Sequence, residues 1–174
     1  EEARQIYQDI LVKFPKNKVA IDGLKALAGA DVGDKSKVQD PPLEQLQPIL
    51  SLHSQGQLQK ALDATSQLLR TFPISATLYN ISGVLNTQLK QLDAAIGSFE
   101  KAIKISPNDN IIYSNMGNTL QEQNKLGEAI EAYSKALAIN PDSAEACNNI
   151  GNALQEQGKL EEALEAFNKA LVIK

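Results

Sequence analysis

The chain has few of the residues that carry redox, metal or disulfide chemistry. It contains one Cys, one His and no Trp in 174 residues, and aromatic residues make up only 5%. A single Cys excludes an internal disulfide framework and a multi-Cys metal site. A single His excludes any cluster that is built on two imidazoles. We therefore expect no metal site and no redox cofactor.

Excess charge of one sign and long apolar runs are also missing. Lys and Arg number 17 against 21 Asp and Glu, a formal net charge of -4, so no basic surplus indicates a nucleic-acid surface. No apolar run approaches the roughly 18–20 residues of a membrane span. The chain starts at Glu1 without a signal-peptide pattern and resembles a piece of a longer protein. We expect neither nucleic-acid nor membrane partners; the location is not identified, with the cytoplasm favoured.

The chain does have a strong internal repeat. Its 43% hydrophobic content indicates a folded chain rather than a disordered one. Several residue types recur at one constant step along the sequence, which indicates a stack of similar units. The recurring positions are Pro73, Pro107 and Pro141; Ala61, Ala95, Ala129 and Ala163; Gly83, Gly117 and Gly151; and Phe99, Tyr133 and Phe167.

Each unit predicts two helices. Apolar residues fall at helical spacing in both halves, and the prolines follow the second helix. A left-handed residue is expected between the two helices. Lys90 replaces the Gly or Asn of the other units, so its turn should be slightly strained or differently closed. The small residues should let paired helices approach closely. The expected N-caps of the first helices are Ser75, Asp109 and Ser143.

Stacking such pairs buries the apolar face that no unit can bury alone, which predicts an all-α solenoid. One unit carries Tyr113, Met116-Gly117, Leu120, Ala129, Tyr133, Ala136 and Pro141 in the order of the tetratricopeptide repeat (TPR) family. The chain resembles that family over residues 42–174, and the resemblance implies a right-handed superhelix of antiparallel helix pairs. Cys147 departs from the pattern because it replaces a bulky residue. Ser82 and Asn86 depart as well, so the first helix of their unit should pack less tightly.

The ends of the chain are less regular. Pro48 falls inside the first helix of a degenerate unit, which should kink that helix or delay its start. The last unit stops before its terminal proline, and its apolar Leu171 and Ile173 should contact further repeats or another molecule, such as a second copy. The predicted organisation is partial TPR-like helices (1–28), a linker (29–42), a degenerate repeat (43–75), and repeats at 76–109, 110–143 and 144–174.

No catalytic constellation is present in the sequence. His53 stands alone near the end of a helix, and Cys147 lies on the packing side of its helix as an inert thiol. The carboxylates Glu161, Glu162 and Glu165 are expected on a solvated face. No glycine motif that would cradle a phosphate occurs. We therefore expect a protein that is not an enzyme and binds no cofactor.

Polar residues recur on one face of the first helices. Asn115 and Asn118 share a helix face, and the same pair recurs one repeat later, so stacking should align these side chains along the concave groove. A carboxamide both donates and accepts, which suits it to bind the backbone of an extended peptide. An equal alternative is that these side chains brace neighbouring repeats. The predicted groove residues are Asn80, Asn115, Asn118, Glu122, Asn148, Asn149, Asn152 and Glu156.

The TPR resemblance implies a peptide-binding groove, and the asparagines resemble those in the repeat arm of O-linked N-acetylglucosamine transferases. No Lys or Arg lies at the groove positions of the well-formed units, so neutral or basic extended segments are the expected partners. The predicted function is a non-catalytic scaffold for protein–protein interaction. Two alternatives stay open. One is the substrate-recruiting arm of a larger glycosyl-, sulfo- or methyltransferase, and the other is self-association through the C-terminal end.

Overall fold

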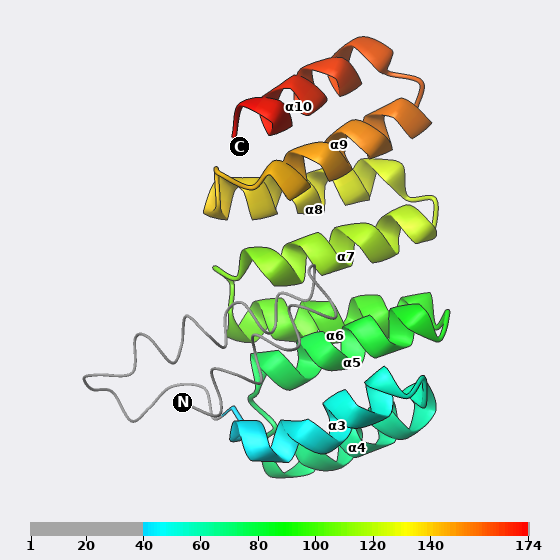
Figure 1. Ribbon diagram of the computed structural model, residues 1–174, viewed down its shortest axis with the longest axis vertical. Coiled ribbons are helices and arrows are strands. Elements are labelled where there is room, and N and C mark those ends of the chain that lie inside the picture. Colours follow the sequence, from blue (N-terminus) through cyan, green and yellow to red (C-terminus); the bar gives the residue numbers. More distant parts are fainter. Residues whose placement is uncertain (1–39, 174) are drawn as a thin grey trace, which may run out of the picture.

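A computed structural model describes residues 40–173 of the chain, in which all secondary structure is helical (Figure 1). The predicted helices within 1–28 and nearly all of the predicted linker 29–42 lie outside the described residues. The eight helices are α3 (Leu43–Ser54), α4 (Leu58–Thr71), α5 (Ala76–Gln88), α6 (Leu92–Ile105), α7 (Asn110–Glu122), α8 (Leu126–Ile139), α9 (Ala144–Glu156) and α10 (Leu160–Val172).

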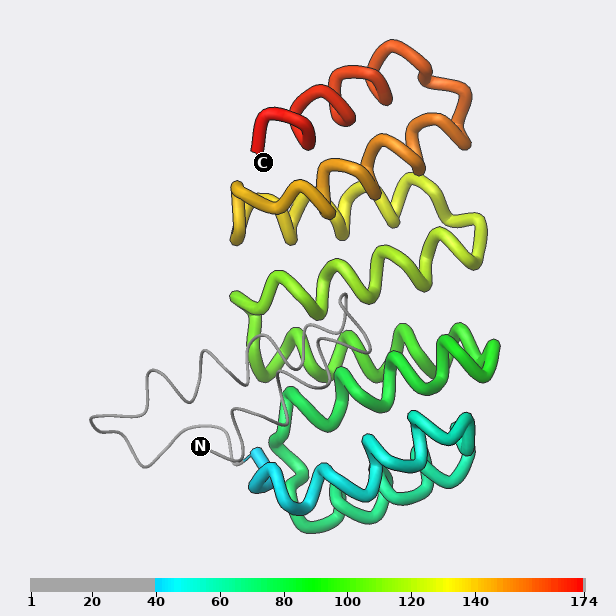
Figure 2. The backbone as a smooth tube through the Cα atoms, viewed as in Figure 1, coloured from blue at the N-terminus to red at the C-terminus, as the bar shows by residue number. Residues whose placement is uncertain are grey.

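The helices form pairs that follow one another along the long axis of the molecule, from α3–α4 to α9–α10 (Figure 2). Each pair packs mainly against its neighbours, so the predicted all-α solenoid is confirmed. The first helices of adjacent pairs also contact one another, α5 with α7 and α7 with α9. The second helices make no comparably extensive contact in the described part of the chain. The stack therefore bends toward its first helices, which line the concave side.

The helix ends follow the predicted chemistry. The side-chain oxygens of Ser75, Asp109 and Ser143 accept backbone N–H bonds from the first turns of α5, α7 and α9 at 3.0–3.1 Å. The turns inside the pairs are closed by left-handed residues. Lys90 has φ 61° and Asn124 has φ 60° at the positions that Gly56 and Gly158 hold in the outer pairs. The turn at Lys90 closes with the same backbone hydrogen bonds as the other turns, so it is not differently closed, and its left-handed conformation costs an L-residue about 1–2 kcal/mol.

Aromatic rings meet glycine backbones within the last three pairs. A Cβ added to Gly117 would lie 2.5 Å from the ring of Tyr133, and the glycines at 83 and 151 face Phe99 and Phe167 in the same way. These distances are far below van der Waals contact, so only glycine lets the first helix approach the ring so closely. The predicted close approach is confirmed, and it is repeated along the stack.

Two irregular places in the sequence are accommodated within regular helices. α3 begins at Leu43 and runs through Pro48, so it does not start after the proline. Ser82 and Asn86 are both buried, and Asn86 Nδ2 donates a hydrogen bond to the backbone oxygen of Ser82 at 2.8 Å. The expectation of looser packing around these two residues is wrong, because their polar groups satisfy one another inside the helix.

Candidate functional site

The predicted groove residues all lie on the first helices α5, α7 and α9, but they differ in exposure. Asn80 is only 4% exposed and therefore cannot meet a partner directly. Asn115 and Asn149 are half-buried. The exposed members, which form the surface that we call the groove face, are Asn118, Glu122, Asn148, Asn152 and Glu156.

Carboxamides link successive first helices. Asn115 Nδ2 on α7 donates to Asn80 Oδ1 on α5 at 3.0 Å. Asn149 Nδ2 on α9 donates to Asn118 Oδ1 on α7 at 3.3 Å. Each bond joins one pair of helices to the next, which is the bracing role that the sequence left open as an alternative. Such bonds use part of the polar capacity of each asparagine and leave the remainder for another partner.

Tyr133 of α8 supports the groove face from behind. Its hydroxyl donates to Asn118 Oδ1 at 2.7 Å and also lies 3.1 Å from Gln121 Oε1. Burial raises the pKa of the Tyr133 phenol, and Glu156 and Glu145 raise it further, so the hydroxyl keeps its proton and acts as a donor. Asn118 Oδ1 accepts from both Tyr133 and Asn149, and within residues 40–173 the Nδ2 group of Asn118 has no acceptor.

The edge of the groove face is held by further bonds between repeats. Lys90 Nζ pairs with Glu122 Oε2 at 2.7 Å, and Gln121 Nε2 donates to Glu156 Oε1. Thr87 and Thr119 bring their hydroxyl oxygens to 2.7 Å between α5 and α7. Sequence reasoning missed these contacts and the polar role of Tyr133. One signal was available, because Tyr133 is the one hydroxyl-bearing ring at a position that holds Phe in the adjacent repeats.

The charged side chains of the groove face are the acidic Glu122 and Glu156, and an ion pair neutralises one of them. Glu122 is paired with Lys90, whereas Glu156 accepts a bond from a neutral amide. No Lys or Arg is among the predicted groove residues. The face therefore offers amide donors and acceptors with a modest negative field.

His53 and Cys147 each have a structural role. His53 Nε2 lies 2.9 Å from Gln88 Oε1, so this ring links α3 to α5. Cys147 is buried, which confirms its predicted position on the packing side of α9. Within residues 40–173, no three His, Cys, Asp or Glu side chains are grouped so that they could hold a metal ion. Nor does that part of the chain contain a helix with the length and apolarity needed to cross a bilayer.

The stacked pairs and their polar concave face define a helical-repeat scaffold for protein interaction. Residues 83–124 and 117–158 match the family model described as TPR repeat, and residues 144–174 match the one described as tetratricopeptide repeat. The chain belongs to the tetratricopeptide repeat family. Proteins of this family are typically non-catalytic interaction scaffolds.

Solved structures of similar shape include the crystal structure of MamA protein, with 25% identity and a TM-score of 0.70 over 99% of this chain and 92% of that one. MamA 41-end from Desulfovibrio magneticus RS-1 has 22% identity and a TM-score of 0.70, covering 98% of this chain and 92% of its own. These likenesses show the fold. No curated protein sequence matches the chain closely enough to count as a relative.

Proposed function

We propose that the chain binds an extended segment of a partner protein along the groove face. The observation that carries this proposal is the set of carboxamide groups that remain available there. Asn118 keeps its Nδ2 donor, since both of its described bonds are made by Oδ1. Asn148 and Asn152 are exposed, and neither side chain has a hydrogen bond to another residue within 40–173.

An extended segment is the ligand that fits such a surface. Its backbone presents N–H and C=O groups in alternation, and none of them is satisfied internally. Asparagine side chains can meet either kind of group and do not depend on the residue type of the partner. The acidic Glu122 and Glu156 then favour a segment that is neutral or basic.

Binding and bracing are divided among the asparagines in this proposal. Asn80 is buried and Asn115 donates to it, so this pair serves mainly to join α5 to α7. Asn148 and Asn152 carry no such bond and serve mainly the ligand. Asn118 does both, because one end of its carboxamide is fixed and the other is free to donate.

The double variant Asn148→Ala with Asn152→Ala should separate binding from stability. A peptide is first selected on the wild-type chain from a random display library, and its affinity is measured by fluorescence anisotropy. We expect the double variant to bind that peptide about 10-fold more weakly, since two hydrogen bonds of about 0.5–1.5 kcal/mol are lost. The melting temperature should stay unchanged because both side chains are exposed.

The matched control is Ser134→Ala, which removes an exposed polar group from the second-helix side of the stack. It should leave both affinity and melting temperature unchanged. Equal affinity of wild type and the double variant for every selected peptide would rule out the groove face as the binding site.

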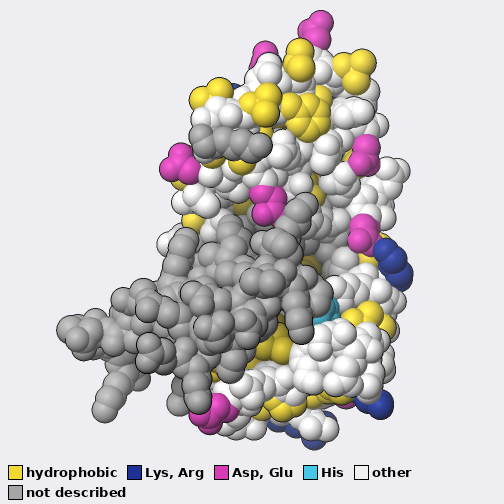
Figure 3. Space-filling model, in the orientation of Figure 1, with side chains coloured by type: hydrophobic (Ala, Val, Ile, Leu, Met, Phe, Trp, Pro, Cys, Tyr) yellow, Lys and Arg dark blue, Asp and Glu magenta, His cyan; other side chains and the backbone are white. Residues whose placement is uncertain are grey.

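Self-association is a second candidate, and the outer face of α10 favours it. Four apolar side chains of α10 are 62% to 84% exposed: Leu160, Leu164, Leu171 and Val172. Figure 3 shows several apolar groups at that end of the molecule, among polar atoms. The counterpart of Leu164 in the preceding repeat, Ile130, packs against the core around Leu154. Leu164→Gln should therefore weaken any dimer that sedimentation velocity detects across a range of concentrations. A wild-type chain that stays monomeric throughout excludes this candidate.

A further inference from the structure

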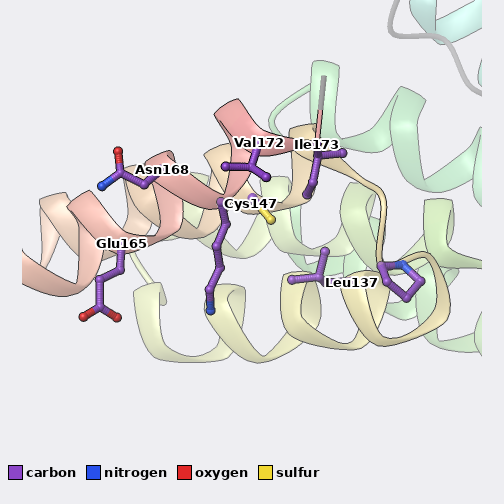
Figure 4. Close-up of a pocket in the computed structure, with 8 residues that line it drawn as sticks. Leu137, Cys147, Glu165, Asn168, Val172 and Ile173 are labelled. Carbon is purple, nitrogen blue, oxygen red and sulfur yellow. The ribbon is translucent and has the colours of Figure 1, made fainter.

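A cavity of about 590 Å³ lies between the second helices at the C-terminal end of the described stack (Figure 4). Leu137 of α8 and Pro141 of the following connection line one side, and Lys169, Val172 and Ile173 line the other. Cys147 of α9 also lines the cavity and is only 2% exposed. None of these residues belongs to the groove face, so this cavity is a separate feature of the molecule.

The preceding repeats show why the cavity exists. Tyr113 holds the position of Cys147 one repeat earlier, and Tyr79 holds it two repeats earlier. In both repeats a lysine of the second helix covers the tyrosine ring. Lys101 Nζ lies 5.5 Å from the ring centroid of Tyr79, and Lys135 Nζ lies 5.9 Å from that of Tyr113.

The last repeat keeps the lysine and lacks the ring. Lys169 is the counterpart of Lys135 in the last repeat, while Cys147 replaces the tyrosine that Lys135 covers. Within residues 40–173, Lys169 has neither an ion pair nor a ring contact. The cavity therefore lies where the two earlier repeats hold a tyrosine ring. Lys169 lies beside it, and the counterparts of Lys169 in those repeats each cover that ring.

We propose that this cavity binds a tyrosine side chain supplied by a segment of a partner protein. The ring would occupy the space above Cys147, between the apolar Leu137 and the stem of Lys169, with the ammonium group over its face. The cavity is within the size range of about 300–1,000 Å³ that is usual for ligand sites, so the ring enters with room for flanking backbone. A partner segment is the expected source because the chain is an interaction scaffold.

Titration of the isotope-labelled chain with N-acetyl-tyrosinamide tests the proposal by NMR. We expect saturable shifts of the backbone amides of Cys147, Lys169 and Val172, with a Kd on the order of 1 mM for so small a ligand. N-acetyl-leucinamide should shift the same amides far less, because it has no aromatic face. The proposal would be overturned if N-acetyl-tyrosinamide and N-acetyl-leucinamide caused equal shifts, or if N-acetyl-tyrosinamide caused none.

Paired lysine variants test the ring contact itself. Lys169→Met keeps the apolar stem and removes the cation, so the affinity for N-acetyl-tyrosinamide should fall about 2- to 5-fold. Lys135→Met makes the same change where Tyr113 already fills the position, and it should leave the affinity unchanged. An equal effect of the two variants would contradict a site at Lys169.

The cysteine provides a second test. Cys147→Tyr should fill the cavity with the chain's own ring and abolish the titration. Tyr113→Cys should open a matching cavity beside Lys135 and add a second set of shifts there. Undiminished binding to a folded Cys147→Tyr variant, or a Tyr113→Cys chain that gains no shifts near Lys135, would overturn the assignment.

Discussion

Replacing Tyr133 with alanine should lower the free energy of unfolding by about 3–5 kcal/mol. The side chain is fully buried, and its ring packs within the core cluster of Leu120, Ala129 and Ala132. The substitution removes that contact area and leaves a cavity between α7 and α8. It also removes the hydroxyl that donates to Asn118. Urea denaturation followed by far-ultraviolet circular dichroism measures the change.

Two further variants measure the contribution of the hydroxyl group alone and the effect of how deeply the ring is buried. Tyr133→Phe keeps the ring and should cost only about 1 kcal/mol, the net value of a typical hydrogen bond. Phe167→Ala should cost less than Tyr133→Ala because Phe167 is only partly buried, in the last pair of the described stack. Stability equal to the wild type in Tyr133→Ala would contradict the placement of this ring in the core.

Gly117→Ala should also lower the free energy of unfolding, by less than Tyr133→Ala. The new Cβ would lie 2.5 Å from the Tyr133 ring, so α7 and α8 must move apart or the ring must leave its position. Overpacking of this kind costs about 1–3 kcal/mol and outweighs the gain of about 1 kcal/mol that alanine brings to a helix interior. The same urea titration should show a net loss of stability.

Gly127→Ala is the matched control for this prediction. Gly127 lies in α8, where an added Cβ meets no atom within 4 Å. Only the helix propensity changes there. Because Gly127 is the second residue of α8, the gain should be a part of the roughly 0.5–1 kcal/mol that alanine brings to the middle of a helix. The two glycine variants should therefore change stability in opposite directions. A gain in both would mean that the ring of Tyr133 yields without cost.

A double variant gives a direct measure of the glycine–tyrosine contact. When Tyr133 is already alanine, the Cβ of Gly117→Ala has no ring to meet. The cost of Gly117→Ala should then vanish, and the departure from additivity gives the interaction energy of the two positions. Strict additivity would place the clash elsewhere.

The regular features of the stack were predictable because each depends on local chemistry. Ser75 caps a helix through its own hydroxyl, and Asn124 closes a turn through its own φ angle. The glycine and aromatic positions repeat at one step, since every unit must solve the same packing problem. These local requirements determined the all-α class, the caps of the first helices and the turns inside the pairs without reference to distant residues.

The use of each polar side chain was decided only by the tertiary structure. Asn80 and Asn148 are equivalent under the repeat, yet one is buried in an inter-repeat bond and the other is exposed. Asn80 accepts a bond from Asn115 of the next first helix, α7, whereas α9 is the last first helix of the described stack and no later pair covers Asn148. Likewise, the sequence shows only that Cys147 replaces a large residue. The space beside Lys169 follows from the way in which α8, α9 and α10 pack around it.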